Sequence, residues 1–129
     1  MERLLEAALM AREFAHAPFS KFKVGAALED SHGCIWTGCN VENSSYGLTV
    51  CAERVAVFKA ISEGIKPRTF KRIAIAADTE KLTPPCGACR QILWEFLGNA
   101  EVILVNPRGE TARYQMIDLL PEPFDASFI

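Results

Sequence analysis

The stretch TVCAERVAVFKAI, Thr49–Ile61, predicts a helix that begins near Cys51, with Thr49 or Val50 as its cap. Four of its residues lie three or four positions apart and therefore share one helix face: Glu53, Val57, Ala60 and Ile61. That face is apolar except for the carboxylate of Glu53, which follows Cys51 by two residues. An acid in the first turn stabilises a helix through its dipole, typically by ~0.3–1 kcal/mol, and this stretch alone favours that interpretation.

The composition is that of one globular domain and not of a nucleic-acid binder. The chain has 129 residues, enough to bury a core, and half of them are hydrophobic, so we expect a single domain over residues 1–129. The formal net charge is −2, and the basic clusters at 21–23 and 67–72 are short. An extended positive surface, which nucleic-acid binding requires, is not predicted.

The N-terminal residues and the number of cysteines indicate in which cellular compartment the protein is expected. Residues 1–17 carry charges throughout, so they predict an amphipathic helix and neither a signal peptide nor a membrane span. Five cysteines, an odd number, make a disulfide framework improbable and favour metal binding or catalysis. Since no targeting signal is visible, we expect a cytoplasmic protein.

Hydrophobic periodicity predicts alternating helices and strands along the chain. The predicted helices cover about residues 2–15, 51–61, 86–97 and 115–120. The predicted strands cover residues 22–29, 34–41, 72–78, 101–106 and 111–115, with turns at 30–33 and 107–110. This order predicts a mixed sheet, largely parallel in its later part, that is sandwiched between helices.

A second cysteine motif, PPCGACRQ at Pro84–Gln91, contains Cys86 and Cys89 in a CxxC spacing. By itself CxxC is compatible with a redox pair, half a zinc site or chance, but a thioredoxin-like pair normally follows an early strand. Here the motif opens a late core helix, just as Cys51 opens an earlier one. Positive helix ends favour thiolates, and if the two helices lie side by side in the same orientation, three soft ligands suited to Zn²⁺ converge.

Three protein ligands leave one tetrahedral position open for water, which is typical of catalytic zinc. Zinc brings the pKa of such a water towards ~7, and Glu53 is then placed to take its proton and pass it to a substrate nitrogen. Arg54 either donates hydrogen bonds to ligand sulfurs, offsetting their negative charge, or is a solvated surface residue. The sequence leaves both interpretations of Arg54 open.

The signatures CAE, Cys51–Glu53, and PCGACRQ, Pro85–Gln91, resemble the zinc-dependent cytidine deaminases. Three further stretches are similar to the small, homotetrameric type of this family: FKVGAAL at 22–28, GCNVENSSYGLTVCAER at 38–54 and DLLP at 118–121. The resemblance covers almost the whole chain. It implies an α/β fold, a three-layer α/β/α sandwich around a mixed five-stranded sheet.

The resemblance also implies roles for individual residues. One Zn²⁺ per chain would be held by Cys51, Cys86 and Cys89, with Glu53 as the proton shuttle and Arg54 in support. The substrate contacts that it implies involve the ribose (Asn40 and Glu42) and the base (Phe22, the backbone of Ala52, and Phe124). Phe124 would come from a neighbouring subunit, so that the active sites of a homotetramer are shared. The chain departs from the family at Phe19, where APFS replaces APYS, and in its divergent tail PEPFDASFI, residues 121–129.

The implied activity is hydrolytic deamination of cytidine and 2′-deoxycytidine to uridine and 2′-deoxyuridine, with release of ammonia, in pyrimidine salvage. The expected partner is a small nucleoside, with no nucleic acid and no membrane. Three alternatives stay open. They are a polynucleotide-editing deaminase, a structural zinc module with Cys34, Cys39 or a histidine as fourth ligand, and a deaminase of a nucleoside-like antibiotic.

Overall fold

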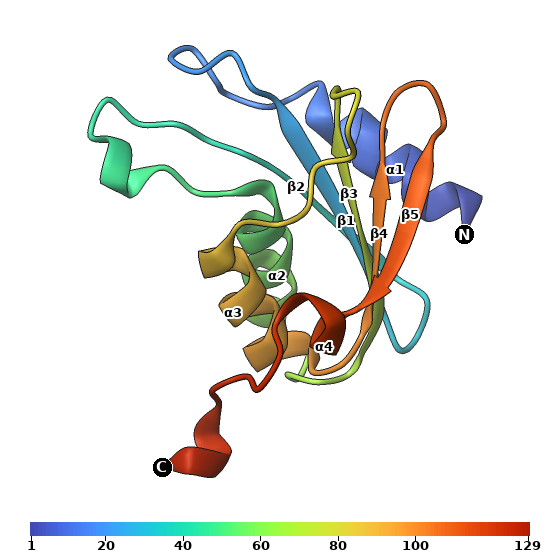
Figure 1. Ribbon diagram of the computed structural model, residues 1–129, viewed down its shortest axis with the longest axis vertical. Helices are drawn as coiled ribbons and strands as arrows, with labels where there is room; N and C mark the ends of the chain where they lie inside the picture. Colours follow the sequence, from blue (N-terminus) through green and yellow to red (C-terminus); the bar gives the residue numbers. More distant parts are fainter.

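A computed structural model describes all residues 1–129 and shows one five-stranded sheet with helices on both faces (Figure 1). The strands are β1 (Val24–Asp30), β2 (Ile35–Cys39), β3 (Phe70–Ala77), β4 (Glu101–Val105) and β5 (Thr111–Gln115). The helices are α1 (Glu2–Arg12), α2 (Ala52–Ser62), α3 (Gly87–Leu97) and α4 (Met116–Leu119). Two short 3₁₀ turns, Tyr46–Leu48 and Ala126–Phe128, complete the structure. The predicted three-layer α/β/α architecture is confirmed.

The strand order is β2-β1-β3-β4-β5, and only β3 and β4 pair in parallel. The expectation that the later part of the sheet is largely parallel is therefore wrong for β5, which pairs antiparallel with β4. The connection between these two strands, residues 106–110, is too short for a crossover and forms a hairpin instead. Helix α3 supplies the long crossover that a parallel β3–β4 pair needs.

Helix α1 covers one face of the sheet, where it buries a cluster of mainly small residues. The helix approaches β1 closely because position 25 is a glycine: a Cβ there would lie 2.1 Å from the carbonyl oxygen of Ala8. The helix ends at Arg12, earlier than predicted, and Arg12 Nε donates a hydrogen bond to the carbonyl of Lys23 at 3.2 Å. Residues 13–14 form a turn instead of a fourth helical turn.

Helices α2, α3 and α4 cover the opposite face and enclose the larger core. Three fully buried alanines, Ala52, Ala56 and Ala60, allow α2 to lie flat against the sheet. Gly38 on β2 serves the same close approach, because a Cβ there would lie 2.5 Å from the carbonyl oxygen of Ala52. The first turn of α2 is thus held at a fixed depth above the sheet.

Both core helices begin at a cysteine. Cys51 is the N-cap of α2 and Cys86 the N-cap of α3. The predicted cap at Thr49 or Val50 is therefore wrong, because Val50 is still extended and exchanges backbone hydrogen bonds with Val41 at 3.0 and 2.9 Å. Helix α2 begins close to the predicted position. Extended backbone pairing continues to Val50, closer to the helix than periodicity alone indicates.

Helices α2 and α3 run in the same direction because the strands before them do. Both β2 and β3 pair antiparallel with β1, so they point the same way, and each helix returns the chain in the opposite sense. The N-termini of α2 and α3 consequently meet at the edge of the sheet that is formed by the carboxyl ends of β2 and β3 (Figure 1). The carboxyl ends of strands are the usual place for ligand sites in open α/β sheets.

The C-terminal segment follows α4 and passes along α3 to a point remote from that edge (Figure 1). Two side chains of α3 hold it. Gln91 Nε2 donates to the carbonyl of Phe124, and Trp94 Nε1 donates to Asp125 Oδ2, both at 2.9 Å. None of the helices combines the length and apolar character needed to cross a bilayer.

Candidate metal centre and active-site pocket

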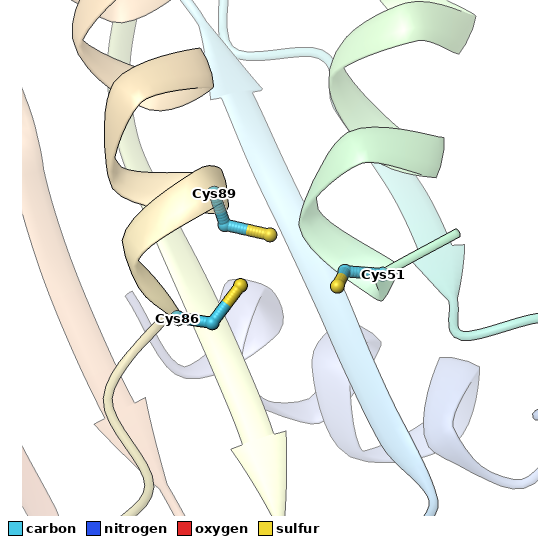
Figure 2. A group of neighbouring side chains, drawn as sticks. All are labelled: Cys51, Cys86 and Cys89. Atoms are coloured by element: carbon cyan, nitrogen blue, oxygen red, sulfur yellow. The ribbon is translucent and has the colours of Figure 1, made fainter. Parts of the chain in front are cut away.

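Three thiols converge where the N-termini of α2 and α3 meet (Figure 2). The sulfur atoms of Cys51, Cys86 and Cys89 all lie within 4.8 Å of one another. Cys89 is buried, Cys51 is half-buried and Cys86 is exposed, so the cluster is open on one side. The structure therefore brings together the three cysteines that the two sequence motifs predicted.

The electrostatics of the cluster favour a thiolate at Cys51. A hydrogen bond from the Cys89 thiol, together with the Arg54 guanidinium, lowers the pKa of Cys51 to about 5. Arg54 Nη2 donates to Cys51 Sγ at 3.1 Å. The same hydrogen bond, with burial and the nearby Glu53, raises the pKa of Cys89, which keeps the proton. Of the two interpretations of Arg54, the contact with sulfur is the one that the geometry favours.

The donor set fits Zn²⁺. Three thiols on two helix N-termini offer the soft ligands that select zinc over harder cations. The Nε atom of Arg54 is buried without a hydrogen-bond partner, so further thiolate charge beside it would be stabilised. The other cysteines and both histidines lie outside the cluster. A structural zinc module with Cys34, Cys39 or a histidine as fourth ligand therefore has no support from the geometry.

Glu53 lies in the first turn of α2 next to this cluster and is only 4% exposed. Burial raises the pKa of Glu53, and the negative charge of the Cys51 thiolate raises it further. The side chain lines a cavity of about 280 Å³. A carboxyl group whose neutral form is favoured by burial can exchange a proton with a ligand in that cavity.

The volume of this cavity is close to the lower limit for small-molecule sites, whose volumes are about 300–1,000 Å³. Its lining comes from the segment before β1, the loop before α2, the first turn of α2, the loop before α3, and one residue each of β1 and β3. The lining residues are Ser20, Phe22, Val24, Asn40, Glu42, Thr49, Cys51, Ala52, Glu53, Ile75, Thr83, Pro84 and Cys86. All predicted substrate-binding residues except Phe124 are among them.

Asn40 and Glu42 reach the cavity from one short segment after β2, as alternation on an extended chain predicts. Asn40 is 8% exposed, and its side chain accepts from Val24 N at 2.9 Å and donates to the carbonyl of Phe22 at 2.7 Å. The Glu42 carboxylate accepts hydrogen bonds from residues 19 and 20. The hydroxyl of Ser20 is the main cause that lowers the pKa of Glu42.

Phe124 does not reach the cavity of its own chain. It is 56% exposed and stacks on Phe128, with ring centroids 5.6 Å apart. Phe19, the departure from the family pattern, is also exposed and packs edge-to-face on Tyr46 at 5.9 Å. The expected role of Phe124 in a neighbouring subunit stays a prediction.

Sequence reasoning missed several cavity residues, of which Ser20 makes the most contacts with predicted site residues. It belongs to the stretch APFS, residues 17–20, in which the sequence drew attention only to Phe19. Thr49 and Thr83 lie close to Cys51 and Cys86 in the sequence, and Pro84 belongs to the second cysteine motif, so this proximity was the available signal. Val24 and Ile75 were expected only as strand residues.

Comparisons with known proteins agree with this geometry. A family model described as cytidine and deoxycytidylate deaminase zinc-binding region matches residues 1–106. The chain is 49% identical over 125 residues to cytidine deaminase of Sporosarcina psychrophila, a match covering 96% of this chain and 90% of that one. It is 50% identical over 125 residues to a probable cytidine deaminase of Dictyostelium discoideum, covering 96% and 83% of the two chains.

Solved structures of cytidine deaminases are also similar to this chain. The crystal structure of cytidine deaminase from Burkholderia pseudomallei superposes with a TM-score of 0.93 at 48% identity, covering 95% of this chain and 98% of that one. Cytidine deaminase from Mycobacterium tuberculosis superposes with a TM-score of 0.80 at 37% identity, covering 95% of each chain.

Proposed function

The chain belongs to the zinc-binding cytidine deaminase family, and from this premise we propose how its own residues carry out the reaction. The activity is zinc-dependent hydrolytic deamination of cytidine and 2′-deoxycytidine, which yields uridine and 2′-deoxyuridine and releases ammonia. The observation that carries the residue assignment is the buried Glu53 beside three convergent thiols in one cavity.

Cys51, Cys86 and Cys89 hold one zinc ion per chain. When bound there, zinc supplies a Lewis acid that lowers the pKa of a water molecule towards ~7. Arg54 partly neutralises the thiolates through its hydrogen bond to Cys51 Sγ at 3.1 Å. What supports this assignment is the donor chemistry of the cluster and its position at two helix N-termini.

Glu53 moves the protons. It accepts one from the attacking water and delivers it to N3 of the pyrimidine while the water oxygen adds to C4. It then carries the second proton to the exocyclic amino group, the C4–N bond breaks, and ammonia leaves. Burial supports this role because it raises the pKa of Glu53, which favours the protonated form that a proton donor needs.

The remaining cavity residues bind the nucleoside. We propose that Asn40 and Glu42 bind the ribose hydroxyls, and that Phe22 and the backbone of Ala52 contact the base. Their support is that all four line the same cavity as Glu53. A cavity of about 280 Å³ suits a free nucleoside better than a nucleotide embedded in a polymer, so we expect no turnover of cytosine in an oligonucleotide.

The assembly and cellular role are also proposals. We propose that residues 1–129 form one catalytic domain that assembles into a homotetramer, with Phe124 of one chain completing the site of another. The exposed aromatic side chains Phe14, Tyr46 and Phe128 support an assembly that covers them. We place the reaction in pyrimidine salvage in the cytoplasm, a setting that suits five cysteines without disulfides.

The first test is the loss of cytidine absorbance on adding purified protein, with zinc quantified in the same sample. We expect about one zinc per chain and conversion to uridine, as three ligands with an open position imply. The Glu53→Gln variant should retain its zinc and its fold. Its kcat should fall by about 10²–10⁴-fold, the usual contribution of a proton-transfer group.

The matched control for Glu53→Gln is Glu63→Gln, which makes the same change at the exposed far end of the same helix. This variant should keep full activity. An active Glu53→Gln enzyme would refute the proton-shuttle assignment. Zinc without turnover of either nucleoside would instead point to a nucleoside-like antibiotic as substrate.

A further inference from the structure

Glu42 is held by three donors from the turn that precedes β1. The backbone N–H groups of Phe19 and Ser20 donate to Glu42 Oε1 at 2.9 and 3.1 Å. The hydroxyl of Ser20 donates to the other carboxylate oxygen, Oε2. Both oxygens are therefore fixed, and Ser20 supplies the only side-chain donor among the three.

The hydroxyl of Ser20 has a second partner. Its oxygen accepts a hydrogen bond from the backbone N–H of Phe22 at 3.0 Å. Phe22 is in turn bound through its carbonyl to the amide of Asn40 at 2.7 Å. One hydroxyl group thus links Glu42 to Phe22 and, through it, to Asn40, which are three of the residues proposed to bind the nucleoside.

The backbone between Ser20 and Phe22 is strained. Lys21 has φ +63°, in the left-handed region that residues with a side chain rarely adopt. Such a conformation persists only where surrounding contacts hold it. Here those contacts are the hydrogen bond from Lys21 N to the carbonyl of Ala17 at 3.0 Å and the two bonds of the Ser20 hydroxyl.

We propose that Ser20 is a positioning residue for ribose recognition: its hydroxyl fixes the Glu42 carboxylate and the Phe22 backbone relative to each other across the cavity. This inference rests on the proposed function, in which Glu42 accepts a ribose hydroxyl. The hydrogen bonds of Ser20 reach Phe22 and Glu42, whereas the thiols and Glu53 lie at the N-termini of α2 and α3. Ser20 therefore acts on binding of the sugar and not on proton transfer.

The test compares two substrates in the zinc-loaded enzyme. Ser20→Ala should raise KM for cytidine about tenfold and leave kcat within about twofold, since a lost hydrogen bond to a charged group weakens binding by roughly that factor. For 2′,3′-dideoxycytidine, which keeps only the 5′-hydroxyl of the sugar, kcat/KM should change by less than about twofold, because Glu42 then has no 2′- or 3′-hydroxyl to bind. Ser20→Thr keeps the hydroxyl and should restore most of the affinity for cytidine.

The matched control is Ser62→Ala, which removes a hydroxyl bonded to the carbonyl of Lys59 at the far end of α2. It should leave both substrates unaffected. Melting temperature and zinc content are measured for each variant. If Ser20→Ala is unstable, Ser20→Cys, which keeps the side-chain size but has only a weak donor, goes through the same comparison.

Three outcomes overturn the inference. An equal loss for both nucleosides means that Ser20 only shapes the cavity. A fall in kcat with unchanged KM means that it acts on the chemistry, and no change in either constant means that it positions nothing. A wild-type enzyme that does not deaminate cytidine refutes the proposed function itself, which separates that failure from the failure of the Ser20 inference alone.

Discussion

At the scale of single residues, the cysteine cluster is prepared for metal before the metal binds. The pKa of Cys51 is lowered to about 5 by its hydrogen bond with Cys89 and by Arg54. At neutral pH Cys51 is therefore a thiolate, the form that binds a metal, and below about pH 5 it takes up a proton. The positive ends of α2 and α3 act in the same direction.

This arrangement predicts a pH dependence in the metal-free protein. The first thiolate should form on raising the pH through about 5, far below the ordinary cysteine value of 9.0, and ultraviolet thiolate absorbance measures it. Arg54→Gln removes a positive charge and a donor, so it should move this midpoint to higher pH, while Arg54→Lys should move it less. An unchanged midpoint in Arg54→Gln would show that Arg54 does not stabilise the thiolate.

At this scale the sequence singled out residues that contradict their local pattern. Glu53 stood out because an acid on an apolar helix face is unusual, and the structure places it buried. Ser20 gave no such signal. Its contact with Glu42 spans 22 positions and depends on a left-handed Lys21, which no periodicity indicates.

At the scale of elements, the position of α2 depends on small residues where it crosses β2. A Cβ on Gly38 would lie 2.5 Å from the carbonyl oxygen of Ala52 and 2.6 Å from the backbone N of Ala56. Both partners are backbone atoms, which cannot rotate away. Any larger residue at position 38 must therefore displace the first turn of α2, which carries Glu53 next to Cys51.

Gly38→Ala should accordingly lower the free energy of unfolding by about 1–3 kcal/mol, the usual cost of overpacking, and reduce activity in the molecules that remain folded. Denaturant unfolding and the cytidine assay measure the two effects. Gly47→Ala is the matched control, because a Cβ there meets nothing within 4 Å. If Gly38→Ala proves as stable and active as Gly47→Ala, the close approach does not position the helix.

The predicted elements were largely correct, but their ends and relative directions were not always so. Periodicity located α2 and α3 to within a residue or two. It did not show that Cys51 and Cys86 are the caps, since the cap depends on where extended pairing stops. Strand β5 runs antiparallel to β4 because the connection between them is short. The predicted turn at 107–110 already implied such a short connection.

At the scale of the whole molecule, the tail and the cavity lie apart. Phe124 lies beside α3, where Gln91 and Trp94 hold the segment, and it does not line the cavity. If Phe124 contributes to a site, that site belongs to another chain.

If Phe124 completes the site of a neighbouring chain, mixing two defective variants should restore activity at some of the sites. In mixed oligomers of Glu53→Gln and Phe124→Ala chains, some sites combine an intact Glu53 with an intact Phe124, so kcat/KM per intact Glu53 should exceed that of Phe124→Ala alone. Mixing Glu53→Gln with Asn40→Ala is the control: both residues line one cavity of one chain, so no site regains both. Absence of rescue in the first mixture would mean that Phe124 does not act across subunits.

The sequence by itself determined the helix faces, the two cysteine motifs, the acid beside them and the family. These properties depend on the order of neighbouring residues, because helical periodicity and motif spacing are local. Only the tertiary structure decided that the two helix N-termini meet, that Arg54 contacts Cys51 and that Ser20 holds Glu42. The physical reason is that such contacts depend on strand direction, helix depth and turn conformation, which bring together side chains from distant parts of the chain.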